Sequence, residues 1–174
     1  TYEVGAERLR QRGTPAHNAV AVNGEDSSEV WSSFRVARRA HPHRVGFGEN
    51  AQGLWLDASH DGYRRLPGIG DVRRVWRLGI GRLEVEDSVE GNDGRLGNSR
   101  VYFHLHPAWK PFMQGDGLGE MASEDDRVHW QAQTGSNAGW HEGTWHPCFG
   151  KSEANDYLRV DLVAGRSCVA FRWQ

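Results

Sequence analysis

The chain has 174 residues and a mass of 19.6 kDa, which is enough for one domain with a substantial core and too little for two ordinary domains. Lys and Arg number 21 against 23 Asp and Glu, and this balance argues against binding of nucleic acid or an anionic membrane through a basic surface. The mean hydropathy is -0.71, no apolar run approaches the ~18 residues of a membrane span, and the eight Trp exclude a disordered chain.

Short strands separated by turn signals are predicted along the whole chain, because 22 Gly and six Pro leave little room for long helices. Alternation of apolar and polar residues, or an extended pattern, marks the segments 19–22, 28–39, 53–57, 72–89 with a break at 79–81, 100–107, 157–163 and 168–173. Asn23-Gly24 and Asp61-Gly62 are turn pairs. The segments 90–97, 115–126 and 135–150 are predicted as loops, the last as an aromatic-rich loop or irregular edge.

This pattern is typical of an antiparallel sandwich or barrel. We predict an all-β fold, a two-sheet antiparallel β-sandwich with under a tenth of its residues in α-helix. In the strand after the 79–81 break, Leu83, Val85 and Val89 share one face, and Asp87 is the exception on that face. Cys148 and Cys168 could form one disulfide, but two free thiols are the favoured interpretation.

Two pairs of polar residues at strand positions could carry chemistry. His17 and Asn18 precede the 19–22 strand, where they offer an imidazole ligand or base and a carboxamide donor; the alternative is a turn in which Asn18 bonds its own backbone. His104 and His106 project from one strand face together with Tyr102. Two imidazoles at this spacing could hold one metal, or the face could simply be a hydrated polar surface.

Two further segments suit carbohydrate. The segment 140–146 could stack sugars on its Trp side chains while His and Glu bond hydroxyl groups, or its indoles could close the end of the core. The basic segment 60–65, with Arg73, Arg74 and Arg77 downstream, could meet carboxylated or sulfated sugars, or it could be an exposed strand face. A phosphate-binding glycine loop and a G-x-S-x-G elbow are absent from the sequence.

A series of motifs in the first 75 residues forms one pattern. It consists of Thr1-Tyr2-Glu3, Arg8 to Arg12, Gly13 to Gly24, Ser27 to Trp31, Phe34 to Arg38, and His60-Asp61-Gly62-Tyr63 followed by Leu66. This pattern resembles the heparinase II/III-like family of bacterial polysaccharide lyases. The chain departs from the family at Ala19, Asn23 and Ser27, where Thr, Asp and Gln are usual.

The resemblance implies that residues 1–174 are a C-terminal β-sandwich domain whose N-terminal α/α-toroid lies upstream, and the start at Thr1 rather than Met fits such a fragment. It implies β-elimination on a uronic-acid-containing polysaccharide, in the periplasm or outside the cell. The toroid and an acidic polysaccharide are then the expected partners, with no nucleic acid and no membrane span. A non-catalytic carbohydrate-binding or structural module in envelope polysaccharide metabolism stays open as the alternative.

The resemblance also suggests site residues. His17 would belong to a metal site whose other ligands lie upstream, so a divalent metal such as zinc is expected in the full-length protein and none in this chain alone. Tyr2 is the one candidate catalytic residue, and the chain alone is predicted to be inactive because the partners of Tyr2 are missing. His17 and Asn18 are expected at a surface that faces the toroid. The candidate substrate-binding residues are Arg12, Asn18, Trp31 and Arg35, with Trp31 and Arg35 on one face of the 28–39 strand.

Overall fold

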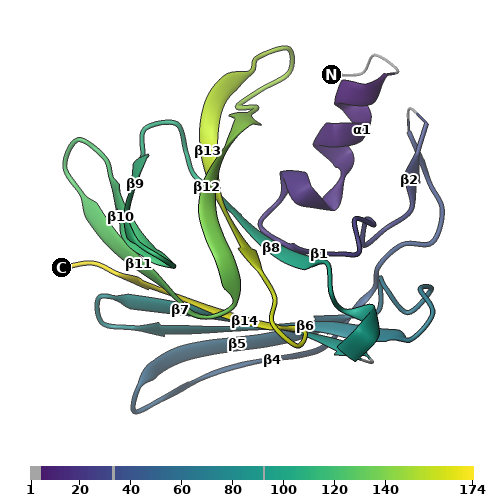
Figure 1. Ribbon diagram of the computed structural model, residues 1–174, viewed down its shortest axis with the longest axis horizontal. Coiled ribbons are helices and arrows are strands. Elements are labelled where there is room, and N and C mark those ends of the chain that lie inside the picture. Colours follow the sequence, from purple (N-terminus) through teal and green to yellow (C-terminus); the bar gives the residue numbers. More distant parts are fainter. Residues whose placement is uncertain (1–4, 33, 92) are drawn as a thin grey trace.

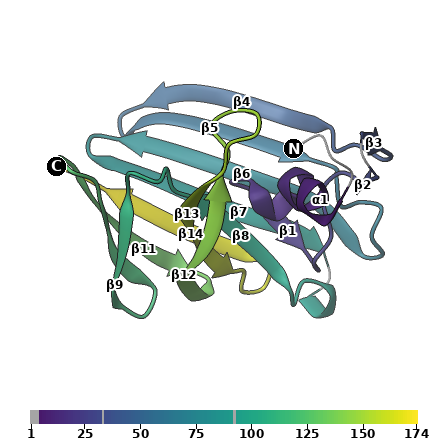
Figure 2. The same cartoon turned by 90° about the horizontal axis from the view of Figure 1, so that it is seen from above.

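The computed structural model describes residues 5–32, 34–91 and 93–174, so the prediction for Tyr2 lies outside the described residues. Two antiparallel sheets stack face to face, with the helix α1 (Ala6–Arg12) beside the smaller sheet (Figures 1 and 2). The larger sheet has eight strands in the order β4-β5-β6-β7-β14-β11-β10-β9, and the smaller has four in the order β1-β8-β13-β12. The predicted β-sandwich is therefore confirmed, and α1 accounts for only seven residues in α-helix.

The strands of the larger sheet are β4 (Pro42–Asn50), β5 (Gly53–His60), β6 (Ile69–Gly79), β7 (Arg82–Gly91), β9 (Lys110–Gly115), β10 (Leu118–Ala122), β11 (Arg127–Thr134) and β14 (Arg166–Arg172). Those of the smaller sheet are β1 (Val20–Val22), β8 (Ser99–His104), β12 (Ser136–Trp145) and β13 (Glu153–Asp161). A separate hairpin pairs β2 (Val30–Trp31) with β3 (Arg35–Val36), and η1 (Thr14–Ala16) and η2 (Asp93–Arg95) are single 3₁₀ turns.

The loop prediction for 115–126 is wrong, because this segment contains β10, which pairs with both β9 and β11. For 135–150 the loop is wrong and the irregular edge is confirmed. This segment contains β12, an edge strand of the smaller sheet that pairs with β13 and has a register break between Ser136 and Gly139. Glycines in β12 suggested a loop, yet Gly143 is required by strand packing. A Cβ there would lie 2.9 Å from Asn155 Oδ1 and 3.0 Å from the Tyr157 ring. The 28–39 segment is likewise a short hairpin and not one strand.

The hydrophobic core lies between the two sheets and is built from both. The smaller sheet contributes Val20, Val22, Val101, Leu158 and Val160, and the larger sheet contributes Val72, Val85, Val89, Trp130, Val169 and Phe171. Trp140 of β12 packs edge-on against Trp130 of β11, with ring centroids 5.6 Å apart. Trp140 is therefore a core residue, which decides between the two interpretations of that indole.

A buried ion pair explains the polar exception on the apolar face of β7. Asp87 is only 1% exposed, and Arg74 of β6 contacts it in a bidentate geometry, with Nε 2.7 Å from Oδ1 and Nη2 3.1 Å from Oδ2. Burial raises the pKa of Asp87, and the charge of Arg74 opposes this shift. The remaining Arg74 nitrogen, Nη1, donates to the carbonyl of Asn18 at 2.6 Å and so links the core to the predicted site.

The His60-Asp61-Gly62-Tyr63 motif ties the larger sheet to β1. The Tyr63 side chain is fully buried, and its hydroxyl lies 2.9 Å from the carbonyl of Val20 and 3.2 Å from that of Glu25. Burial raises the pKa of the Tyr63 phenol. Asp61 accepts a hydrogen bond from the backbone of His41 at 2.7 Å, which fixes the approach to β4. In this fold the motif holds the larger sheet to β1 through the Tyr63 hydroxyl, and we call this contact the Tyr63 clasp.

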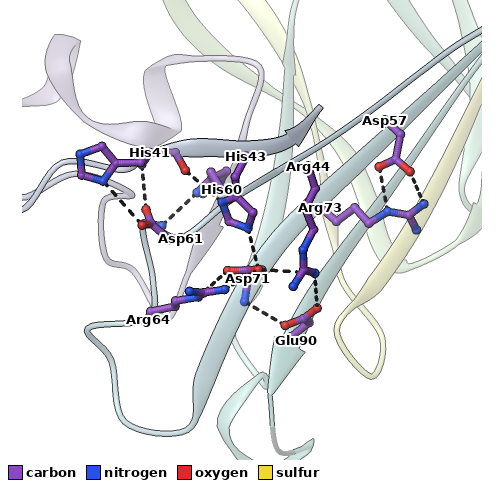
Figure 3. Close-up of polar contacts among 11 residues, drawn as sticks. His41, His43, Arg44, Asp57, His60, Asp61, Arg64, Asp71, Arg73 and Glu90 are labelled. Atoms are coloured by element: carbon purple, nitrogen blue, oxygen red, sulfur yellow. Dashed lines mark hydrogen bonds and ion pairs between the residues drawn. The ribbon is translucent and has the colours of Figure 1, made fainter. Parts of the chain in front are cut away.

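A charged cluster beside this motif is centred on Asp71, as Figure 3 shows. The carboxylate is fully buried and contacts His43 Nε2 at 2.8 Å and Arg64 Nε at 2.6 Å. Arg44 lies 3.8 Å from both Asp71 and Glu90. Burial raises the pKa of Asp71, but the hydrogen bonds from Arg64 and His43 outweigh burial and hold that pKa below its usual value.

The lowered pKa of Asp71 predicts acid-sensitive stability. Its contribution is present above the unfolded pKa of ~3.9 and is lost as the pH falls through the lower folded pKa. We expect Asp71→Asn to flatten the decline in the free energy of unfolding between about pH 5 and about pH 2, measured by urea titration at each pH. Asp125→Asn, an exposed turn position, is the control and should keep the wild-type slope. Equal slopes in all three proteins would contradict the assignment.

The two cysteines are free thiols, as favoured by the sequence. Cys148 is exposed, and Cys168 in β14 contacts Gln133 Oε1 at 3.3 Å. Burial raises the pKa of the Cys168 thiol to about 11. Cys168 is thus protonated and poorly nucleophilic at neutral pH.

Candidate functional site

The side chains of most chemical interest lie on the face of the smaller sheet that points away from the core. Residues that alternate with the buried Leu158 and Val160 project from this side, and strand pairing aligns them in rows. We call this surface the outer face; it comprises Arg100, Tyr102 and His104 of β8, His141 of β12, and Tyr157, Arg159 and Asp161 of β13. The helix α1 lies on the same side of β12 and β13 (Figure 1).

Three rings of the outer face form one row across three strands. His104, Tyr157 and His141 are direct register partners, with centroid distances of 5.0 Å from His104 to Tyr157 and 5.4 Å from Tyr157 to His141. Tyr102 adds a fourth ring 5.7 Å from Tyr157. With strands spaced ~4.8 Å apart, this ring row extends about 10 Å across the sheet. Because neighbouring rings of this row lie closer to parallel than to perpendicular, they stack on one another and present mainly their edges outward, as an ordered aromatic surface.

His104 is held in a single tautomer. Its Nε2 lies 2.9 Å from the carbonyl of Pro15, and because a carbonyl only accepts, Nε2 carries the proton. The Nδ1 atom therefore keeps its lone pair. Burial lowers the pKa of His104, which favours the neutral ring at neutral pH. The backbone N–H of His104 donates to Asn18 Oδ1 at 2.7 Å, so Asn18 is joined directly to the end of the ring row.

A pocket of about 370 Å³ lies between α1 and this end of the outer face. We call it the α1 pocket; its walls include Arg10, Pro15, His104, Glu142 and Tyr157. Arg10 Nη2 donates to Thr144 of β12, which fastens the helix to the sheet. Arg10 also bonds Glu7 within α1, and these hydrogen bonds lower the pKa of Glu7 to about 2. The helix is thus one wall of a pocket that opens beside the ring row.

The next row of the outer face holds an incompletely paired cation. Arg159 lies in register between Tyr102 and Gly139, and its nearest carboxylate atom, on Asp161, is 4.0 Å away. Asp161 is already satisfied by Arg100 Nε at 3.1 Å and Asn137 Nδ2 at 3.0 Å. Within the described part of the chain, the buried Arg159 Nε has no hydrogen-bond partner. Nε is shielded from solvent, but the Arg159 side chain is 29% exposed, and a guanidinium without a close carboxylate is a binding group for an oxyanion.

The structure places His17 and Asn18 at the surface, directly before β1. Both are exposed, as predicted, and Asn18 is anchored by its bonds to His104 and Arg74. Across the described ranges, no group of three or more His, Cys, Asp or Glu residues could hold a metal ion. His106 does not join His104 in a metal site, because its ring packs 4.6 Å from Trp145. The part of the chain that the structure describes therefore contains no complete metal site, and His17 as one ligand stays a prediction.

The other predicted substrate-binding residues gather at the β2–β3 hairpin. The Arg12 guanidinium donates to the carbonyls of Ser32 at 3.2 Å and Arg35 at 3.5 Å, so it fastens the hairpin to α1. Trp31 and Arg35 are cross-strand partners on one face, and the guanidinium lies 4.8 Å from the indole centroid. Trp31 is 47% exposed. Their role in substrate binding stays a prediction.

The basic cluster predicted near residue 73 is internally paired. Arg73 contacts Asp57, Arg74 contacts Asp87, and Arg77 contacts both Glu84 and Glu86. Arg73 and Arg77 thus pair across strands on the outer surface of the larger sheet, and Arg74 belongs to the buried pair on its core face. Tyr157, Arg159 and Arg10, by contrast, were missed by the sequence analysis. The first two could have been found, because they alternate with the predicted core positions Leu158 and Val160.

The architecture defines an antiparallel β-sandwich domain whose smaller sheet carries a polar and aromatic outer face. The family model for the heparinase II/III-like C-terminal domain matches residues 1–174, and the chain belongs to this family. A search of curated protein sequences finds no match. Within the described residues, α1 and the other helical segments are too short to cross a bilayer.

Solved structures of similar fold are lyases of heparan sulfate and related enzymes. The heparan sulfate lyase HepC from Pedobacter heparinus superposes with a TM-score of 0.70 at 16% identity, over 96% of this chain and 25% of that chain. A heparinase III gene product gives a TM-score of 0.72 at 12% identity, over 97% of this chain and 25% of that chain. This chain thus spans about a quarter of the length of those enzymes.

Proposed function

We propose that this domain forms one wall of the active-site cleft of a polysaccharide lyase that cleaves a uronic-acid-containing polysaccharide by β-elimination. The observation that carries the proposal is the link between Asn18 and His104. It connects the family-matched segment around His17 to a ring row and an under-paired arginine, which are the groups that an acidic sugar requires. The family membership of residues 1–174 supports the same function.

The chemistry needs three groups at once. A base removes the proton at C5 of the uronate, the electron pair forms the C4–C5 double bond, and O4 leaves with a proton from an acid. The carboxylate at C5 must be neutralised or hydrogen-bonded for the intermediate to form. In this chain the Asn18 side-chain NH₂ is a donor for that role, because its Oδ1 is already bonded to His104. The base and acid are proposed to come from Tyr2 and the upstream domain.

A non-catalytic carbohydrate-binding module is the second candidate. The ring row favours it, because contact with an ordered aromatic surface holds a sugar without any acid or base. The two candidates differ in what the full-length protein does to a uronate polymer. A module would bind the polymer and leave it intact.

Turnover measurements separate these functions. We expect the full-length protein to release unsaturated uronate, followed by ultraviolet absorbance, from at least one of heparan sulfate, alginate and hyaluronan. The 174-residue chain alone should release none, because general acid–base help of ~10²–10⁴-fold is lost without positioned partners. His17→Ala in the full-length protein should lower kcat by about 10²-fold or more. Product from the chain alone would place the whole active site in these residues, and binding without product by the full-length protein would favour the module.

A further inference from the structure

We infer that the outer face contains a subsite for an acidic saccharide unit, in which a pyranose ring lies against the outward edges of Tyr157 and His141 and its carboxylate or sulfate binds Arg159 above Gly139. This inference specifies which residues of the wall hold the sugar, and so it rests on the proposed function. It depends on three features of the outer face: the ring row, the under-paired guanidinium, and the free space between them.

The ring row supplies an ordered aromatic surface that the sugar contacts. Tyr157 is flanked by His104 on one side and His141 on the other, at 5.0 Å and 5.4 Å between centroids, so its plane is fixed by its neighbours. A ring that is already held in place loses little side-chain entropy when a sugar binds. The Gly143 backbone beside Tyr157 has no side chain that would displace the phenol ring.

Arg159 supplies the charge. It lies two residues along β13 from Tyr157 on the same face, a separation of about 6.6 Å along a strand. That distance is comparable to the span of one pyranose ring with its exocyclic acid group. Asp161 is engaged by Arg100 and Asn137, and it lies 4.0 Å from Arg159. An incoming oxyanion would therefore pair with the exposed part of the Arg159 guanidinium without displacing a close ion pair.

Gly139 supplies the space. It is the register partner of Arg159 on β12, and a Cβ built at this position would meet no heavy atom within 4 Å. Its backbone is not in the left-handed region, so the strand does not require glycine for conformational reasons. A position next to an under-paired cation, open and without a side chain, is the geometry expected where a ligand lies across a sheet.

The open position allows a test that adds bulk and removes no binding group. We propose calorimetric titration of the 174-residue chain with hexasaccharides of hyaluronan, heparan sulfate and neutral chitin. Gly139→Leu should weaken binding of the acidic hexasaccharides by at least about tenfold. Gly97→Leu is the control and should leave binding unchanged, because Gly97 is also open to solvent but lies in a loop away from β12. Tyr157→Ala should weaken binding to a similar extent, with Phe112→Ala, exposed on β9, as its control.

A second set of variants tests the role of the charge. Arg159→Gln is compared with Arg166→Gln, which changes an exposed arginine of β14. We expect Arg159→Gln to reduce the preference for acidic over neutral hexasaccharide about tenfold, and the control to leave it unchanged. Binding of both acidic ligands assigns the Arg159 contact to the carboxylate, and binding of heparan sulfate alone assigns it to sulfate. Thermal melts identify any variant that fails to fold, and Gly139→Leu and Arg159→Gln are expected to keep the wild-type melting temperature.

Three results would overturn the subsite: no binding of either acidic hexasaccharide, equal binding of the neutral one, or unchanged binding after Gly139→Leu in a folded protein. These outcomes are independent of turnover. If the full-length protein has no lyase activity but the 174-residue chain shows this binding pattern, the proposed function is rejected and the subsite is retained. If the full-length protein is active but these variants do not change binding, the subsite is rejected and the proposed function is retained.

Discussion

Arg74→Met should lower the free energy of unfolding by about 3–5 kcal/mol, because it leaves the buried carboxylate of Asp87 without its counter-charge. The substitution also removes the hydrogen bond to the carbonyl of Asn18. Urea denaturation monitored by Trp fluorescence measures the change. We expect the mutant to bind saccharide less well even below its transition, since Asn18 and His104 would lose a support.

The neighbouring residue Arg73 provides a matched control. It forms the same type of pair, with Asp57, but its side chain is 48% exposed and that of Asp57 is 26% exposed. Arg73→Met should therefore cost only about 0–1 kcal/mol. The double variant Arg74→Met with Asp87→Leu removes both charges and should recover most of the lost stability. Equal losses for Arg74→Met and Arg73→Met would show that burial of the Asp87 pair is not what matters.

The Tyr63 clasp is the second position where a large effect is expected. Tyr63→Ala deletes a fully buried ring and should cost about 3–5 kcal/mol. Tyr63→Phe keeps the ring but leaves the carbonyl of Val20 without its partner, which should cost about 1–3 kcal/mol. Hydrogen exchange distinguishes a clasp from simple packing. Tyr63→Phe should speed exchange in β1 and the loop to Glu25 more than in β11.

Exposed aromatic positions set the baseline for this comparison. Phe112→Ala on β9 removes a ring that is 54% exposed and should change stability by less than about 1 kcal/mol. If Tyr63→Phe were as harmless as this control, and exchange in β1 stayed slow, the hydroxyl would have no part in joining the sheets. The motif would then act only through the volume of its ring.

The strands that the sequence revealed are those with one face in the core. The segments 100–107, 157–163 and 168–173 alternate cleanly because one side chain in two is buried. The strands β12 and β10 were not predicted, for different reasons. Gly139 and Gly143 in β12 face outward, so period-two alternation is hidden. In β10, Gly119 lies against Trp130, where a Cβ would come within 2.9 Å of the indole.

The candidate site was predicted in part for a similar reason. His17 and Asn18 belong to a continuous family motif and were found, whereas the ring row joins three strands that are far apart in the sequence. Only the pairing register brings His104, Tyr157 and His141 together, and no local pattern encodes that register. The helix α1 was also missed. It has only seven residues between Gly5 and Gly13, and a helix this short is stable only through tertiary contacts, which the sequence does not show.

The outer strands of both sheets carry features that discourage association between copies of the chain. β4 begins at Pro42 and has a register break between His43 and Gly46, with Arg44 at φ 49° inside the break. β9 contains Pro111, and β12 has its own break between Ser136 and Gly139. Each interruption removes a donor or bends the backbone where a foreign strand would dock. The edges at β4, β9 and β12 are therefore poor templates for the addition of a strand from a second copy of the domain.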